Sequence, residues 1–414
     1  MAEEVPLLSC LHSSHGKSSS LQTLGNIIVS IVGTGVLGLP FAFRVAGWLA
    51  GSIGVIIAGV SCCYCMILLV HTRDVLATEE STELKTYGDL GAKALGKPGG
   101  YLTELLILIS QCGGAVAYLL FIGQNLFSVF HGPSGMSYSS FIFLLVPVEI
   151  ALSFIRSLSA LSPFSAFADV CNVLAMAIVV KEDLQLFDGF KKTSAVTSLG
   201  ELPFAAGMAV FCFEGFGLTL SLEAAMRERR RFRSVLLSAI VFITAIYLCF
   251  GFFGYMAYGE ETKDIITLNL PQNWSSVAVK VGLCVALTFT FPIMMHPIYE
   301  IVEAKLERNF LFQKLCSNSR VARIFFLNTA RVICVLALAV VASFVPSFGT
   351  FVSLVGSTVC ALLAFVLPAS FHFLLAGASS PPWQRALDMA IVLLGLAFAG
   401  YGTYSTVSRN WMAS

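Results

Sequence analysis

Apolar runs long enough to cross a bilayer recur along almost the whole chain, and this feature restricts the fold more than any other. A helix needs about 20 apolar residues to span the hydrocarbon core. The sequence supplies eleven such runs, at roughly 21–48, 49–72, 101–130, 138–156, 158–180, 200–223, 234–258, 276–300, 324–346, 348–375 and 386–408. Only 12% of the residues are charged, against about 25% in a soluble domain. We therefore predict an all-α polytopic membrane protein with eleven transmembrane helices.

Lysines and arginines predict the orientation, because cytoplasmic loops retain positive charge during insertion. With a cytoplasmic N-terminus, seventeen of them fall on the cytoplasmic side and five on the other. Residues 1–20 are then a cytoplasmic tail, which lacks the pattern of a signal peptide. The sequon Asn273-Trp274-Ser275 falls on the non-cytoplasmic side, so Asn273 is a candidate glycosylation site.

The first span is interrupted by GTGVLG, residues 33–38. The spacing matches a dinucleotide-binding loop, but no βαβ unit surrounds it, and no acidic residue follows about twenty residues later. Three glycines and then Pro40 are unfavourable inside a helix. Pro40 suits the first turn of a second half-helix that starts near Leu39. A small-residue packing face is the alternative interpretation.

The sixth span, MAVFCFEGFGLTLSLE, carries a second interruption, with Glu214 followed by Gly215 and Gly217. Five spans precede it, so it enters the membrane from the side opposite to the first span. Two broken helices at corresponding positions of two five-helix halves indicate an inverted-repeat transporter with its site at the midplane. We place the repeats at 21–180 and 200–375, with a non-cytoplasmic loop at 181–199 and the eleventh helix in 376–414.

Broken helices suit an amino-acid zwitterion as the substrate. Its carboxylate and its ammonium group must leave water, which is costly unless each finds partners. The N-terminus of a half-helix offers N–H groups and a positive dipole end to the carboxylate, and unwound carbonyls accept from the ammonium group. Glycine lets the ligand approach the backbone closely.

Four long segments also resemble one family: NIIVSIVGTGVLGLPFAFRVAGW, FCFEGFGLTLSLEAAMRE, GYMAYGEETKDIITLNLP and LTFTFPIMMHPIYEIVE. The chain resembles the amino acid/auxin permease family over residues 21–408, and in particular its plant branch of aromatic and neutral amino acid transporters. The resemblance implies the fold of the bacterial leucine transporter, with five plus five inverted helices and an eleventh added. It also implies transport of neutral and aromatic amino acids, extending to auxin.

By position, the resemblance assigns substrate contacts to the two unwound segments and to spans three and eight, which line the site in this fold. These residues are Gly33, Thr34, Gly35, Phe213, Glu214, Gly215, Phe216, Tyr118 and Thr288. The first three are expected to contact the substrate's carboxylate and ammonium groups. The phenylalanines are either walls for the substrate side chain or ordinary core packing.

Carboxylates inside a membrane are costly and usually functional. The candidates for proton coupling are Glu104, Glu149, Asp169 and Glu214. Glu214 adjoins a break and is our first candidate for the proton-coupling group, with Asp169 second. The alternative is that the Glu214 carboxyl group has a structural role and forms a hydrogen bond to a neighbouring helix without moving protons.

Two departures from the family bear on the coupling ion. Its sodium-coupled branch has asparagine at the position of Val29, and its proton-coupled animal branch has histidine at the position of Asn26. We therefore do not expect sodium coupling, and we expect any proton step to use another group.

Two rival functions also fit parts of the sequence. Gly132-Pro133-Ser134-Gly135 matches the motif of an intramembrane serine protease, with His296 or His372 as a base. The serine lies in a short turn between spans rather than at a sheltered helix start, so we do not expect an enzyme. A non-transporting amino-acid sensor with the same pocket remains the alternative. The short tail and loops favour a transporter.

The N-terminal tail fits an acidic dileucine sorting signal, with Glu3, Leu7 and Leu8 as its determinants. With the family resemblance, this signal favours the vacuole or another endomembrane over the plasma membrane. The expected partners are amino acids, protons and the lipid bilayer, with no nucleic acid. We expect no cofactor and no metal site, because Cys62 and Cys65 lie inside an apolar span without further ligands.

Overall fold

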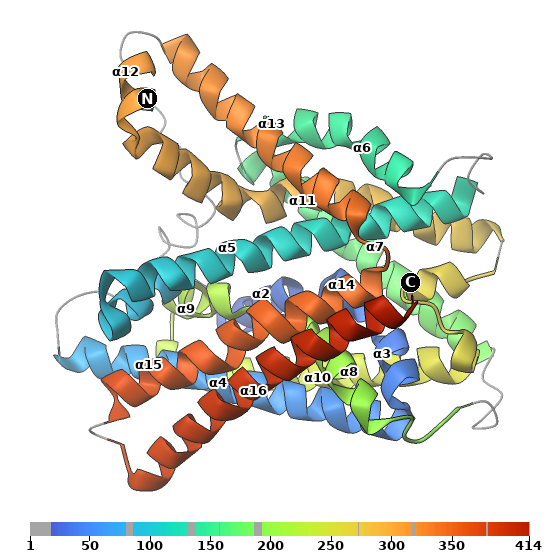
Figure 1. The fold of residues 1–414 in the computed structure, drawn as a ribbon, viewed down its shortest axis with the longest axis horizontal. Coiled ribbons are helices and arrows are strands. Elements are labelled where there is room, and N and C mark those ends of the chain that lie inside the picture. Colours follow the sequence, from blue (N-terminus) through green and yellow to red (C-terminus); the bar gives the residue numbers. More distant parts are fainter. Residues whose placement is uncertain are drawn as a thin grey trace. The chain divides into compact units, whose positions relative to one another are not determined.

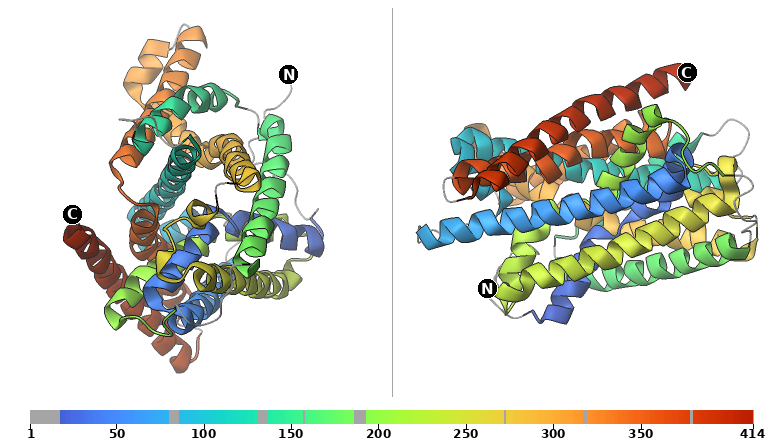
Figure 2. Two further views of the ribbon diagram at one scale, coloured as in Figure 1. Left: turned by 90° about the vertical axis from the view of Figure 1, so that its right-hand side faces the viewer. Right: turned by 90° about the horizontal axis from the view of Figure 1, so that it is seen from below.

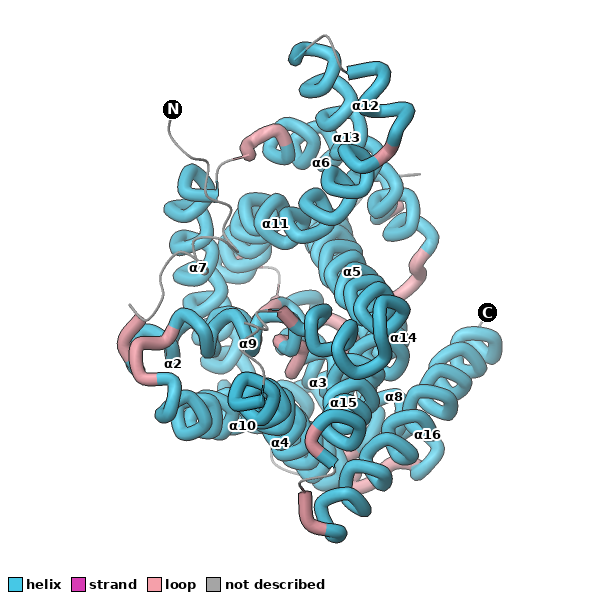
Figure 3. Tube along the Cα trace, turned by 90° about the vertical axis from the view of Figure 1, so that its left-hand side faces the viewer, coloured by secondary structure: helices cyan, strands magenta, loops and turns pink. Residues whose placement is uncertain are grey.

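Each of the eleven apolar runs forms helix in the computed structural model, which describes residues 18–79, 86–130, 137–156, 158–185, 193–271, 273–316, 320–377 and 380–413. Figure 3 shows helices joined by loops throughout this part of the chain. The α-helices are α2 (Ser20–Ile31), α3 (Leu39–Ala46), α4 (Trp48–Glu79), α5 (Tyr87–Phe130), α6 (Tyr138–Ser153), α7 (Leu158–Gln185), α8 (Leu202–Cys212), α9 (Phe216–Ala225), α10 (Phe232–Tyr258), α11 (Trp274–Arg308), α12 (Phe310–Cys316), α13 (Arg320–Phe344), α14 (Phe348–Val355), α15 (Leu367–Leu375) and α16 (Pro382–Ala413).

Eight helices within the described residues are long and apolar enough to cross a membrane, or nine if the pair α2 and Thr34–Ala46 counts as one span bent by 49°. This establishes a polytopic membrane protein, but not the predicted count of eleven. The helix α6 is apolar and has only 16 residues, and α7 is not among the eight.

The chain divides into two compact units. The first unit contains Gln111–Val179 and Leu270–Phe348. Within it, α6 packs on α11 and α13. The Tyr138 hydroxyl donates to the Val345 carbonyl at 2.6 Å. Arg331 on α13 pairs with Glu303 on α11 at 2.6 Å and donates to the Ser153 carbonyl at the end of α6 at 2.7 Å.

The second unit contains the described residues up to Ser110, together with Val180–Asn269 and Gly349–Ser414. It holds both interrupted spans with α4, α10, α15 and α16. Figure 2 shows α4 and α10 side by side, and α16 packs along α15 and the segment that precedes it (Figure 1). Each unit takes helices from both predicted repeats, so the repeat boundaries stay a prediction.

The ends of the two interrupted spans pair with one another. Ser18, which precedes α2, donates its N–H to the Ala225 carbonyl at 3.2 Å and accepts from the Arg227 N–H at 3.0 Å, beyond α9. At the opposite ends, the Thr197 N–H, which precedes α8, donates to the Ala46 carbonyl of α3 at 3.0 Å. Each broken span therefore starts where the other finishes, and the two run antiparallel.

Polar side chains anchor the two halves of these spans to their neighbours. Arg73 on α4 pairs with Glu223 on α9, and both side chains are almost fully buried. Arg44 on α3 donates to the Thr262 carbonyl at 2.8 Å, just after α10. Breaking a buried pair leaves an uncompensated charge, which costs about 3–5 kcal/mol. The half-helices are therefore fixed at their outer ends and interrupted in the middle.

Candidate functional site

The first break separates α2 from α3. The helix α2 ends at Ile31, Val32 is extended, and residues Thr34–Gly38 form a 3₁₀ turn that leads into α3. The second half-helix starts at Leu39 with Pro40 in its first turn, as predicted. Among the residues that the structure describes, the N–H groups of Gly33, Thr34 and Gly35 have no hydrogen-bond acceptor. They offer donors at the start of a helix, where the dipole favours an anion.

The second break separates α8 from α9. The helix α8 ends at Cys212, and α9 starts at Phe216. The Oε2 atom of Glu214 is buried and has no hydrogen-bond partner within the described part of the chain. A buried carboxylate oxygen without a partner is costly, so this atom is available to a proton or to a cationic group.

The two breaks lie against each other. A Cβ placed on Gly35 would lie 3.0 Å from Cys212 Sγ and 3.2 Å from Phe211 Cδ1. A Cβ placed on Gly215 would lie 2.9 Å from Ile31 Cγ1. The two breaks therefore lie side by side, with each of these glycines against residues that flank the other break; the assignment of the substrate contacts stays a prediction. A side chain at either position would press against these facing side chains, which favours glycine at both.

The phenylalanines of the second break are core residues. Phe213 and Phe216 are 0% exposed. The ring of Phe213 packs edge-on against Tyr247, with 5.1 Å between ring centroids, and it also faces Gly59 of α4. Neither side chain has surface left for a substrate, which favours the core-packing interpretation over the wall interpretation.

Phe211 is an aromatic residue of α8 that faces the first break. It is partly exposed, and its ring edge lies against Gly35. The sequence did not predict this position, because the glutamate and the glycines that mark the break all follow Cys212. The position of a side chain around α8 depends on the rotation of that helix, which the sequence does not give.

The remaining substrate candidates belong to the first unit. Tyr118 on α5 is 8% exposed. The Thr288 hydroxyl on α11 donates to the Cys284 carbonyl of its own helix at 2.8 Å. Because each unit is described by itself, their contribution to a site at the breaks stays a prediction.

The other three candidates for proton coupling lie on α5, α6 and α7. Glu149 on α6 is 0% exposed, and neither of its oxygens has a partner among the described residues. It therefore shares with Glu214 the property expected of a proton-binding group. Asp169 lies on α7, but its side chain lies outside the described residues. Glu104 lies on α5 against Gly88.

Asn273 caps the N-terminus of α11. Its side-chain oxygen accepts from the Ser276 N–H at 2.8 Å and from the Ser275 hydroxyl at 2.9 Å. The sorting residues Glu3, Leu7 and Leu8 and the segment 132–135 lie outside the described residues. Use of the sequon and of the sorting signal stays a prediction.

A π-helical stretch beside the second break was not predicted. Between α14 and α15 the backbone forms two π turns, Gly356–Cys360 and Leu362–Val366. The first of these packs so closely on α8 that a Cβ on Gly356 would meet the Gly207 carbonyl. The Tyr87 hydroxyl donates to the Leu363 carbonyl at 2.9 Å. Such turns occur often at functional sites, but an apolar run gives no sign of them.

Solved structures similar to this chain include two transporters. One is Mhp1, a nucleobase-cation-symport-1 family transporter, with a TM-score of 0.56, 12% identity, and coverage of 96% of this chain and 93% of Mhp1. The other is MhsT in complex with L-phenylalanine, with a TM-score of 0.52, 15% identity, and coverage of 93% and 98%. These similarities establish the leucine-transporter-like fold.

Sequence comparison identifies relatives over nearly the full length. Amino acid transporter ANT1 of Arabidopsis thaliana is 58% identical over 94% of this chain and 93% of that protein. Vacuolar amino acid transporter 3 of Saccharomyces cerevisiae is 27% identical over 99% of this chain and 59% of that protein. The family model "Transmembrane amino acid transporter protein" matches residues 16–408. The chain thus belongs to the transmembrane amino acid transporter family.

Proposed function

We propose that this chain is a proton-driven secondary transporter of neutral and aromatic amino acids, which alternates access around a site at the two breaks. One observation carries the proposal. Within the described part of the chain, the N–H groups of residues 33–35 and a buried oxygen of Glu214 have no hydrogen-bond partner, and they lie on two breaks that pack together. Donors for an anion and an acceptor for a cation therefore lie on adjoining segments.

This combination matches the charges of an amino-acid zwitterion. The carboxylate binds the N–H groups at the start of the 3₁₀ turn, where the Thr34 hydroxyl adds a donor. The ammonium group binds the carbonyls of the unwound segments and the Glu214 carboxylate. A carboxylic acid such as auxin has no ammonium group and cannot make these contacts. The 58% sequence identity to a plant amino acid transporter supports this substrate class. A protein of similar fold, MhsT, binds L-phenylalanine, which also supports it.

The same carboxylate gives a reason for proton coupling. Glu214 Oε2 has no partner among the described residues, so a proton satisfies it at low cost. Binding of the substrate's ammonium group to the Glu214 carboxylate and binding of a proton to the same carboxylate then depend on each other. Val29, where the sodium-coupled branch carries asparagine, is 53% exposed and lies outside the break. Sodium has no evident ligand there.

The proposed location is the vacuole or another endomembrane, with the N-terminus in the cytoplasm. The similarity to a vacuolar transporter of yeast supports it. Fluorescent tagging of the full chain with and without Leu7→Ala and Leu8→Ala tests it, because loss of the sorting signal should move the protein to the plasma membrane.

Uptake into liposomes tests the transport function. Purified full-length protein is reconstituted, and uptake of labelled phenylalanine, tyrosine and alanine is measured with and without an imposed pH gradient, with sodium replaced by choline. We expect saturable uptake that needs the pH gradient and ignores sodium. Unlabelled auxin, added as a competitor, should inhibit less than phenylalanine.

Three results would contradict parts of this proposal. Uptake that requires sodium would exclude proton coupling. Equal inhibition by auxin and phenylalanine would exclude a role for the ammonium group. Saturable binding of phenylalanine without any uptake would instead support the amino-acid sensor.

A further inference from the structure

Tyr247 lies in the middle of α10 and its side chain is 0% exposed. Its hydroxyl donates toward two backbone carbonyls, that of Cys212 at 2.9 Å and that of Ile31 at 3.2 Å. Ile31 is the last residue of α2, and Cys212 is the last residue of α8. One side-chain atom from a third helix therefore contacts the final turn of both half-helices that lead into the breaks.

The chemistry of these two carbonyls explains the contact. The last carbonyls of a helix have no donor within the helix. In the middle of a membrane no bulk water replaces that donor, and an unsatisfied backbone group costs several kcal/mol. A tyrosine hydroxyl has one proton, so it must serve both carbonyls by sharing that proton. Both oxygens must then stay within hydrogen-bond distance of a single atom.

We propose that Tyr247 is a positioning residue for substrate binding, which holds the two breaks in register by bridging the Ile31 and Cys212 carbonyls. The inference rests on the proposed function and deepens it. Gly33 follows Ile31 by two residues, and Glu214 follows Cys212 by two residues. A change in the spacing of the bridged carbonyls therefore displaces the donors for the carboxylate relative to the acceptor for the ammonium group.

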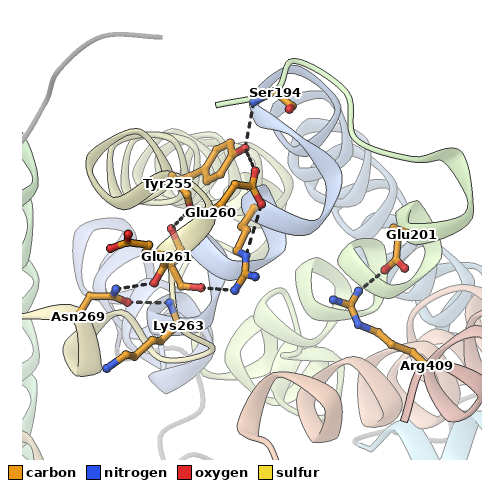
Figure 4. A network of polar contacts seen from close by, with 11 residues as sticks. Ser194, Glu201, Tyr255, Glu260, Glu261, Lys263, Asn269 and Arg409 are labelled. Carbon is orange, nitrogen blue, oxygen red and sulfur yellow. Dashed lines mark hydrogen bonds and ion pairs between the residues drawn. The ribbon is translucent and has the colours of Figure 1, made fainter. Parts of the chain in front are cut away.

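The ring and the hydroxyl of Tyr247 have separable roles. The ring packs against Phe213, and this contact survives replacement by phenylalanine. Tyr247→Phe thus removes the bridge and keeps the packing. Tyr255 on the same helix provides a matched control, because it is also 0% exposed. Its hydroxyl donates to the Glu260 carboxylate and accepts from the Ser194 N–H, both at 3.1 Å (Figure 4). These contacts lie near the C-terminal end of α10 and involve no residue of either break.

The first test is transport kinetics in liposomes. We expect Tyr247→Phe to raise KM about tenfold, which corresponds to the net loss of one hydrogen bond, for phenylalanine and alanine alike, with kcat within about twofold of wild type. The increase is equal for both substrates because the bridge positions the groups that bind the common backbone of the substrate. Tyr255→Phe should leave KM unchanged.

The second test does not depend on transport. A Cβ on residue 35 would lie 3.0 Å from Cys212 Sγ, roughly the distance between a Cβ and the partner sulfur in a disulfide. Gly35→Cys should therefore cross-link to Cys212 when copper phenanthroline oxidises the two thiols to a disulfide. Adding Cys212→Ala should prevent it. In the Gly35→Cys background, Tyr247→Phe should slow cross-linking several-fold, whereas Tyr255→Phe should not.

The outcomes separate this inference from the transport function. Equal cross-linking in the Tyr247→Phe and Tyr255→Phe backgrounds would overturn the bridge, whatever the transport data. An increase in KM of the same size in both variants would also overturn it, because it would indicate general destabilisation. Slower cross-linking with Tyr247→Phe in a protein that takes up no amino acid would support the bridge and contradict the transport function alone.

Discussion

Gly47 lies so close to the Ala195 carbonyl that a Cβ on residue 47 would come within 2.5 Å of that oxygen. Gly47 ends α3 with a φ of +93°, a conformation that side chains rarely adopt. Ala195 precedes α8, and its carbonyl accepts from the Leu49 N–H at 3.0 Å. This contact fixes the point where one broken span ends and the other begins.

We therefore expect Gly47→Ala to destabilise the protein by more than about 1 kcal/mol, through the strained φ and the clash with Ala195. Thermal unfolding of the detergent-solubilised protein measures the change. Gly54→Ala is the control, because it lies on α4 and a Cβ there meets nothing within 4 Å. A melting temperature lowered equally by both substitutions would contradict the role of the Ala195 contact.

Gly33 differs from Gly35 in its surroundings, since a Cβ on Gly33 meets nothing within 4 Å. Its φ of −118° also suits alanine. We expect Gly33→Ala to keep the melting temperature and to weaken phenylalanine binding about tenfold, equivalent to about 1.4 kcal/mol, because the methyl group would occupy space that we propose for the substrate. Scintillation proximity binding measures the affinity.

Two further variants serve as a negative and a positive control for Gly33→Ala. Gly25→Ala, on the exposed face of α2 with open space around it, should change neither property. Gly35→Leu should abolish binding, because its side chain overlaps Cys212 and Phe211. Unchanged affinity in both Gly33→Ala and Gly35→Leu would return the glycines to a packing role.

The positions of both breaks could be predicted because their causes are local. Three glycines followed by Pro40, and Glu214 followed by Gly215, are unfavourable in any apolar helix, whatever surrounds them. The start of α3 at Leu39 followed from the same reasoning.

The contacts around the breaks could not be predicted, since they depend on how helices rotate and pack. Tyr247 appears in the sequence as one tyrosine in an apolar run, and its partners lie 216 and 35 residues away. The one available signal is that a buried tyrosine hydroxyl usually finds a partner. The sequence suggested Phe213 as a substrate wall, whereas the structure places Phe211 against the first break, and this difference also depends on how α8 is rotated.

Phe211 and Phe213 should respond differently to truncation. We infer from its position against Gly35 that Phe211 contacts the substrate side chain. Phe211→Ala should therefore lower the preference for phenylalanine over alanine by about tenfold and should change stability little. Phe213→Ala should cost about 3–5 kcal/mol of stability, as for other buried aromatic residues, without changing the preference of the folded fraction. Competition binding and thermal unfolding measure the two effects.

The assignment would be wrong if Phe213→Ala changed the substrate preference while Phe211→Ala did not. Phe216→Ala is a second core control, because Phe216 is also 0% exposed. It should resemble Phe213→Ala in both measurements.

Glu214→Gln should remove the dependence of uptake on the pH gradient and weaken phenylalanine binding less, because the amide keeps the size of the carboxyl group but cannot exchange a proton. Uptake in liposomes with imposed pH gradients measures the first effect, and equilibrium binding the second. Glu149→Gln is the informative comparison, since the Glu149 side chain is 0% exposed and both of its oxygens lack a partner among the described residues. If the gradient dependence is lost in Glu149→Gln and kept in Glu214→Gln, the coupling proton binds on α6 rather than at the break.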